Sequence, residues 1–152
     1  MKVRSATFEH GGDIPQSMVF NGMGQNGKNR SPHLELMDVP EGTKSLAIVM
    51  HDPDAPTSGG FYHWVVFNIP GDVREIAEGN APGTHGHTDF GIKNYGGPAP
   101  PPGPAHRYNL TVYALDTEQL PIDDSTTGAK LEFMVAQHAL AKGSITGHYK
   151  AS

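Results

Sequence analysis

The sequence contains no cysteine, no long apolar run and little positive charge. Without cysteine, the 152-residue chain has no disulfides, no thiolate chemistry and no zinc–sulfur sites. Eleven Lys and Arg against sixteen Asp and Glu give a formal net charge of −5, which argues against nucleic-acid binding and against docking on anionic membranes. No segment approaches the ~20 apolar residues of a membrane span, and the N-terminus does not lead into a signal-peptide-like run. We therefore expect a cytoplasmic protein with neither a nucleic-acid partner nor integral membrane association.

The bulk composition indicates one folded domain that is rich in loops and strands. Hydrophobic residues make up 36% and charged residues 18% of the chain, which is apolar enough to fold and not charged enough for disorder. Nineteen Gly and thirteen Pro stand between apolar runs, as turn residues do in β proteins. We predict a single domain over residues 1–152 that is mainly β, with antiparallel strands on one or two sheets.

Three segments have strong strand patterns. Residues 44–52 form a short aliphatic run, as expected for a strand covered on both faces. Residues 62–69 are aromatic and β-branched and end at a Pro-Gly turn signal. Residues 107–115 alternate between apolar and polar side chains. Weaker strand patterns occur over residues 2–8, 33–37, 73–77 and 144–150.

One helix is predicted over residues 127–142. Thr127 has the type of side chain that caps helix N-termini, and Gly143 stands where a C-cap glycine is common. Apolar side chains lie on opposite sides of this helix, with Leu131 on one side and Phe133 on the other. Such a helix is usually covered on more than one side, by its own sheet and a loop or by a second subunit. A homodimer is therefore expected.

Polar side chains follow or begin each of the three strong strands. Asp52 and Asp54 stand in an Asp-Pro-Asp-Ala-Pro segment, where two prolines stiffen the backbone. His63 precedes the only Trp, and His106 follows a segment of Gly and Pro. Each feature alone is compatible with a structural role, as a strand-ending turn, a buried strand histidine or a polyproline segment. Together, imidazoles, a tyrosine hydroxyl and glycine N–H groups would make a donor-rich pocket for a phosphate or carboxylate.

The same segments resemble the signature blocks of the phosphatidylethanolamine-binding proteins, also called Raf kinase inhibitor proteins. The matching blocks are Asp52-Pro53-Asp54-Ala55-Pro56, His63 at its strand, and the Gly-Pro loop that ends in His106-Arg107-Tyr108. Further matches lie at residues 29–34, 39–45 and 113–116, and residues 138–149 resemble the end of the short bacterial and archaeal branch. The similarity covers nearly the whole chain in the right order.

The resemblance implies an antiparallel β-sandwich with Greek-key connections and a helix near the C-terminus. It also implies an anion pocket at one end of the sandwich. Carried over by position, the pocket residues are Asp52, Asp54, His63, Gly97, Pro100, His106 and Tyr108. The ligand would be phosphate, a phosphoethanolamine-like group or a carboxylate, with no cofactor and no metal. The chain departs from the family in a short stretch after Pro56, and it stops at Ser152 without the further helix of animal members, so we expect an open pocket.

We therefore predict a non-catalytic regulatory protein that binds small anions. The first alternative is a protein inhibitor of a serine protease or a protein kinase, acting through an exposed loop. The second is a metal-dependent hydrolase using Asp52, His63 and His106, with His85 and His87 as a further pair of ligands. If protonated histidines hold the anion, phosphate affinity should rise as pH falls from about 8 to 6. The Ala55-Pro56 bond is expected to be cis, because rigid turns beside binding sites often retain cis proline.

Overall fold

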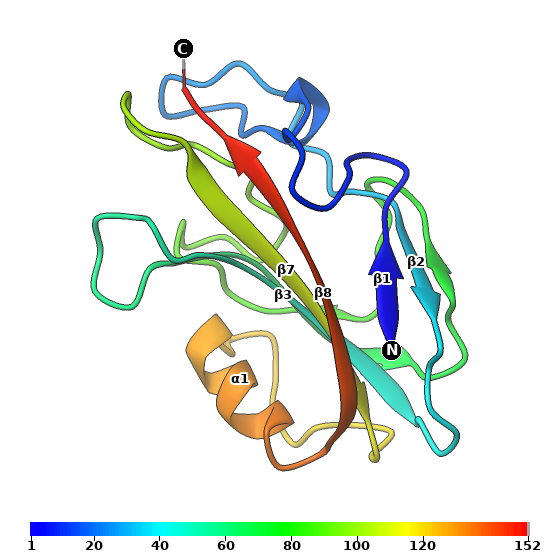
Figure 1. Cartoon of the computed structure of the whole chain (residues 1–152). Helices are drawn as coiled ribbons and strands as arrows, with labels where there is room; N and C mark the ends of the chain where they lie inside the picture. Colours follow the sequence, from blue (N-terminus) through cyan, green and yellow to red (C-terminus); the bar gives the residue numbers. More distant parts are fainter. Residues whose placement is uncertain (152) are drawn as a thin grey trace.

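Antiparallel pairing organises the chain into a three-stranded and a five-stranded sheet, as predicted (Figure 1). The computed structural model describes residues 1–151. The small sheet has the strand order β1-β2-β5 and the large sheet the order β6-β4-β3-β7-β8. The elements are β1 (Lys2–Arg4), a short 3-10 helix (Gln16–Met18), β2 (Leu34–Met37), β3 (Ser45–Asp52), β4 (Phe61–Pro70), β5 (Glu75–Ile76), β6 (Thr84–His85), β7 (His106–Leu115), α1 (Gly128–Val135) and β8 (Ala139–Tyr149).

The large sheet is covered on both faces. Ile48 and Met50 of β3 pack toward the small sheet, in one core with Leu34 and Leu36 of β2. The intervening Val49 packs on the opposite face, in a second core that includes two residues of α1, Leu131 and Val135. Figure 1 shows α1 and the strands β1 and β2 on opposite sides of the large sheet. This arrangement confirms the prediction that residues 44–52 form a strand with no solvent-exposed face.

The last strand corrects the predicted helix. Thr127 caps α1 as expected, since its side chain accepts a hydrogen bond from the Lys130 N–H, but the helix ends at Val135. Residues 139–149 instead pair with the whole length of β7, and Gly143 lies opposite Val112 in that ladder. Residues 136–142 have helical periodicity, but pairing with the distant strand β7 decides the structure of residues 139–142. Local propensity contains no information about such pairing.

Two large apolar side chains, Phe133 of α1 and Leu140 of β8, are open to solvent in the described part of the chain. Phe133 is 68% and Leu140 is 46% exposed, so neither the sheet nor a loop among residues 1–151 covers them. The homodimer stays a prediction. Within the same residues, no helix is long and apolar enough to cross a membrane.

The strand directions bring the candidate residues to one edge of the large sheet. Strand β3 ends at Asp52, and its antiparallel neighbours β4 and β7 begin there, with Asp52 paired to Phe61 and His51 to Asn109. Every peptide bond among the described residues is trans, so the expected cis bond before Pro56 is wrong. The Asp-Pro-Asp-Ala-Pro turn is closed instead by the Asp52 carboxylate, whose Oδ1 accepts a hydrogen bond from the Asp54 N–H at 2.8 Å.

Candidate ligand-binding site

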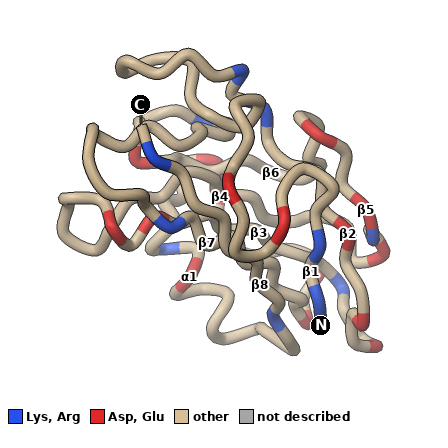
Figure 2. The backbone as a smooth tube through the Cα atoms, turned by 45° about the horizontal axis from the view of Figure 1, so that its top comes forward, with Lys and Arg blue, Asp and Glu red and all other residues tan. Residues whose placement is uncertain are grey.

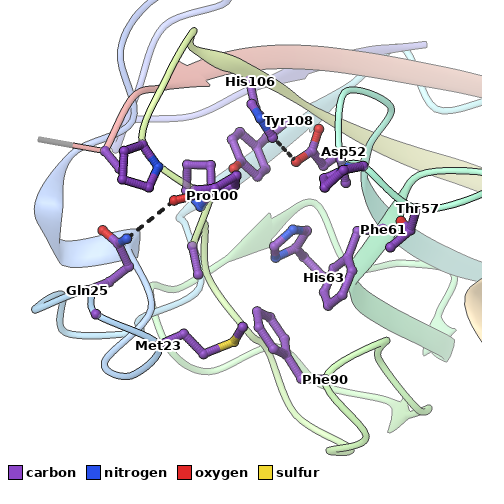
Figure 3. A pocket seen from close by; sticks show the side chains of 17 residues that line it. Met23, Gln25, Asp52, Thr57, Phe61, His63, Phe90, Pro100, His106 and Tyr108 are labelled. Atoms are coloured by element: carbon purple, nitrogen blue, oxygen red, sulfur yellow. Dashed lines mark hydrogen bonds and ion pairs between the residues drawn. The ribbon is translucent and has the colours of Figure 1, made fainter.

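A cavity of about 550 Å³ opens at this edge of the sheet (Figure 3). Asp52, His63, His106 and Tyr108 lie in its wall, together with Pro100 of the Gly-Pro loop. Two other predicted residues lie outside the lining. Asp54 is bound to Arg107, and Gly97 packs against the backbone behind the loop. The structure thus gathers five of the seven predicted residues around one cavity; their contact with a ligand stays a prediction.

The Asp52 side chain fixes the ring of His106. Nδ1 of His106 donates a hydrogen bond to Oδ2 of Asp52 at 2.7 Å, and Asp52 is only 2% exposed. The two Asp52 oxygens are therefore shared between the His106 ring and the turn that follows β3. His106 makes no second side-chain hydrogen bond within residues 1–151, and its Nε2 carries a proton only when the ring is charged. The pair can thus present an N–H to a ligand after protonation.

The Tyr108 hydroxyl is buried without a partner. It makes no hydrogen bond of normal geometry with any described residue, although Tyr108 is only 1% exposed. Burial, the nearby negative charge of Asp52 and the approach of the Asp52 carboxylate to the hydroxyl all raise the pKa of this phenol, so it stays protonated. A buried polar group without a partner is uncommon and needs an explanation. A ligand that accepts from Tyr108 would supply one.

A β-bulge places His63 in the cavity. Met50 pairs with Trp64 and His51 pairs with Tyr62, so His63 is the extra residue of β4. Strict alternation would put His63 on the same face as Val65, beneath α1. The bulge turns it toward the cavity instead, as bulges near functional sites often do. The bulged backbone is also anchored, since the His63 carbonyl accepts a hydrogen bond from the Gly96 N–H at 2.9 Å.

The Gly-Pro loop determines which ring nitrogen of His63 carries the proton. Its Nδ1 lies 2.8 Å from the carbonyl oxygen of Gly96 and 3.1 Å from that of Gly97, and carbonyls only accept hydrogen bonds. Nδ1 therefore carries the proton and the neutral ring has a lone pair on Nε2. Burial lowers the pKa of His63 to about 4, against partial compensation by the Gly96 carbonyl and Asp52. Burial therefore disfavours a charged His63 between pH 6 and 8, while the predicted rise of phosphate affinity with falling pH stays a prediction.

The glycine pair shapes the loop and does not offer its N–H groups to the cavity. The Gly96 N–H donates to His63 and the Gly97 N–H donates to Oδ1 of Asn29 at 2.7 Å. A Cβ on Gly97 would lie 1.9 Å from the carbonyl oxygen of Met18. Close backbone packing, and not anion contact, is thus what requires glycine at this position.

The rest of the cavity is apolar and aromatic, which the sequence did not indicate. Phe61 and Phe90 meet edge to face at 4.8 Å between ring centroids, and both surround His63. Met23 and Pro100 border the opening, where the Gln25 amide donates to the Pro100 carbonyl at 3.5 Å (Figure 3). No signal in residues 20–25 or 90 marked them for this role. The cavity therefore has a polar end at the strand edge and an apolar remainder.

Positive charge is scarce around the cavity. Neither Lys nor Arg is among the described residues that line it. Arg107 lies nearby, but its guanidinium is bound to Asp54 at 2.8 Å, and this contact with Arg107 lowers the pKa of Asp54 to about 2. Figure 2 shows basic and acidic residues mixed over the molecule. Recognition here would depend on hydrogen bonds and on His106 more than on a cationic field.

The histidines do not form the metal centre of the hydrolase alternative. Among the described residues, the one set of three possible ligands within 4.8 Å is His33, Glu35 and Glu75 on the small sheet. There, Nδ1 of His33 accepts from the Ala6 N–H, so the proton sits on Nε2 and no lone pair is free for a cation. His85 and His87 bind separate backbone carbonyls, those of Ala81 and Asp124.

Comparison with known proteins finds one family throughout. The family model described as phosphatidylethanolamine-binding protein matches residues 4–150. The protein YbhB of Escherichia coli K12 is 45% identical, over 98% of this chain and 99% of its own. The crystal structure of E. coli YbcL, described as a new member of the mammalian PEBP family, superposes with a TM-score of 0.95 at 37% identity, covering 99% of this chain and 98% of that one. A homologue from Chlamydia trachomatis has a TM-score of 0.87 at 31% identity, covering 99% and 97% of the two chains.

Proposed function

Because this chain belongs to the phosphatidylethanolamine-binding protein family, we propose that its cavity binds a small molecule or side chain bearing a phosphoryl group. The observation that carries the proposal is the buried Tyr108 hydroxyl, which makes no hydrogen bond of normal geometry with any of residues 1–151. Beside it, Asp52 holds His106 in position to add a second donor. Two donors at the polar end of the cavity match the oxygens of a phosphoryl group.

The apolar part of the cavity supports a ligand larger than phosphate itself. A volume of about 550 Å³ is in the range of sites for small organic molecules, and Phe61, Phe90 and Pro100 offer contact area without charge. The family's name refers to a lipid whose head group is a phosphoethanolamine ester. A phosphoryl ester with a short organic group would thus use both ends of the cavity.

The lining residues favour binding over covalent catalysis. The described hydroxyl side chains that face the cavity are those of Thr57 and Tyr108. Thr57 already donates to the Gly60 carbonyl at 2.6 Å, and the raised pKa of Tyr108 makes it a poor nucleophile. The Asp52–His106 pair therefore has no activated nucleophile beside it, and we propose that the protein is a non-catalytic, regulatory binder.

Calorimetric titration with phosphoethanolamine at pH 6 tests this proposal. With two or three hydrogen bonds and no Lys or Arg, we expect a dissociation constant on the order of 1 mM or somewhat below. His106→Ala should reduce affinity at least tenfold while the circular dichroism spectrum stays unchanged. His87→Ala, a histidine outside the cavity, is the matched control and should bind as the original protein does. Equal binding by both variants, or none by the original protein, would contradict the proposal.

A further inference from the structure

We propose that the cavity selects a phosphoryl group in its protonated, singly charged form, because Nε2 of His63 can only accept a hydrogen bond from the ligand. This inference rests on the proposed function and specifies it. In this proposal His63 acts as a hydrogen-bond acceptor. It therefore favours an anion that carries a proton over one that does not.

The geometry fixes the direction of the hydrogen bond. Both atoms that Nδ1 of His63 contacts are carbonyl oxygens, at 2.8 and 3.1 Å, so the proton of the neutral ring stays on that side. Nε2 makes no hydrogen bond with any of residues 1–151, and these residues do not enclose it completely. His63 lines the cavity, and Figure 3 shows its ring directed into it. The free lone pair therefore faces the space that a ligand would fill.

The surroundings of His63 do not favour a second proton on the ring. Its ring packs edge to face against Phe90 and Tyr108, at centroid distances of 5.3 and 5.2 Å. The charged and titratable groups around it are Asp52 from β3, His106 and Tyr108 from β7, and Asp89 from the loop before Phe90. Desolvation outweighs the attraction of both carboxylates, so the ring stays neutral at physiological pH.

An acceptor at this position discriminates between anions of equal charge. A phosphate monoester below its second pKa, near 6, has one charge and one P–O–H that can donate to His63. A sulfate monoester has the same charge and nearly the same shape but no proton. Its oxygen would face the Nε2 lone pair, which loses a hydrogen bond and leaves an acceptor unpaired. Tyr108 and a protonated His106 serve both anions alike.

Phenyl phosphate and phenyl sulfate are the probes, titrated calorimetrically against the full chain at pH 5.5. We expect phenyl phosphate to bind at least tenfold more tightly. At pH 8, where phenyl phosphate has lost its proton, this advantage should fall to threefold or less. Equal affinities at pH 5.5 would overturn the inference while leaving phosphoryl binding intact. Failure of both anions to bind would overturn the proposed function and this inference with it.

Two further measurements separate the role of His63 from a general change in the cavity. His63→Asn keeps an N–H near the position of Nδ1, able to donate to the loop carbonyls, but removes the acceptor at Nε2. This variant should bind the two anions within about twofold of each other. Independently of any ligand, the imidazole ¹⁵N shifts of His63 should show a proton on Nδ1 and none on Nε2 between pH 5.5 and 8. A proton on Nε2 would overturn the inference even if the variant fails to fold.

Discussion

Nδ1 of His106 and Oδ2 of Asp52 lie 2.7 Å apart at the edge of the sheet where β3 ends and β7 begins. The contact is enclosed, since the two side chains are only 11% and 3% exposed. Asp52 thus places a negative charge beside a cavity for which we propose an anionic ligand. Its role in binding must therefore be to orient the His106 ring, because its own charge repels the anion.

Simple electrostatics would predict that removing the charge of Asp52 raises the affinity for an anion. The contact with His106 predicts the opposite. Asp52→Asn removes a negative charge, yet we expect affinity for phosphoethanolamine at pH 6 to fall at least threefold. An amide can offer Nδ1 either its oxygen or its NH₂ group, so it fixes the orientation and the hydrogen bonding of the His106 ring less well than the carboxylate does. Asp54→Asn removes the same charge outside the cavity and should change affinity by less than twofold. Tighter binding by Asp52→Asn would show that repulsion dominates.

The neutral His63 predicts a loss of stability in mild acid. Its pKa is about 4 in the folded protein, against an ordinary value of 6.5, so the unfolded chain binds more protons between these two values. This contribution to stability is complete above pH 6.5 and declines as pH falls toward 4, by at most about 1.4 kcal/mol per pH unit. Urea unfolding of the original protein and of His63→Asn at pH 7, 5.5 and 4.5 measures it. The stability difference between the two should shrink with acid; a constant difference would contradict the assignment.

The Asp54–Arg107 pair predicts a second, separate pH window. Hydrogen bonds from Arg107 lower the pKa of Asp54 to about 2, so its contribution is present above pH 4 and is lost as pH falls toward 2. The pair is half exposed, with Arg107 at 55%, and its effect should be small. Asp54→Asn should lower the urea midpoint slightly and equally at pH 5, 6 and 7, and most of this difference should be gone at pH 2. A difference as large at pH 2 as at pH 7 would point to another cause.

The Gly-Pro loop should tolerate no side chain at Gly97. Because a Cβ there would overlap the Met18 carbonyl, Gly97→Ala should cost about 2 kcal/mol or more in the free energy of unfolding. Gly22→Ala is the control, since its nearest neighbour is the edge of the Phe20 ring at 3.2 Å and not a backbone atom, and it should cost less than about 1 kcal/mol. Thermal and urea unfolding measure both. Similar costs in the two variants would contradict the packing account.

Local pattern was sufficient for the main strands and for the neighbourhood of the site. Strand β3 is recognisable because an unbroken aliphatic run fits a strand covered on both faces, and β7 because one of its faces is buried throughout. Antiparallel pairing then brings Asp52, His63 and His106 to one edge. The family resemblance supplied the sandwich and the order of the blocks, which periodicity alone does not contain.

The remaining features depend on contacts between distant residues. The bulge at His63 changes which face that ring occupies, and only pairing with β3 reveals it. Residues 139–142 have helical periodicity but complete the ladder beside β7. The direction of hydrogen bonding at His63 is set by carbonyls more than 30 positions away. For this reason, a set of residues that looked donor-rich in the sequence contains an obligate acceptor in the structure.

A crystal structure of the protein grown with phosphoethanolamine at pH 6 tests the central claim most directly. We expect the phosphoryl group at the polar end of the cavity, with oxygens within about 3.2 Å of the Tyr108 hydroxyl and of Nε2 of His106. A cavity that holds only water at a saturating ligand concentration, or a phosphoryl group bound elsewhere on the surface, would contradict it.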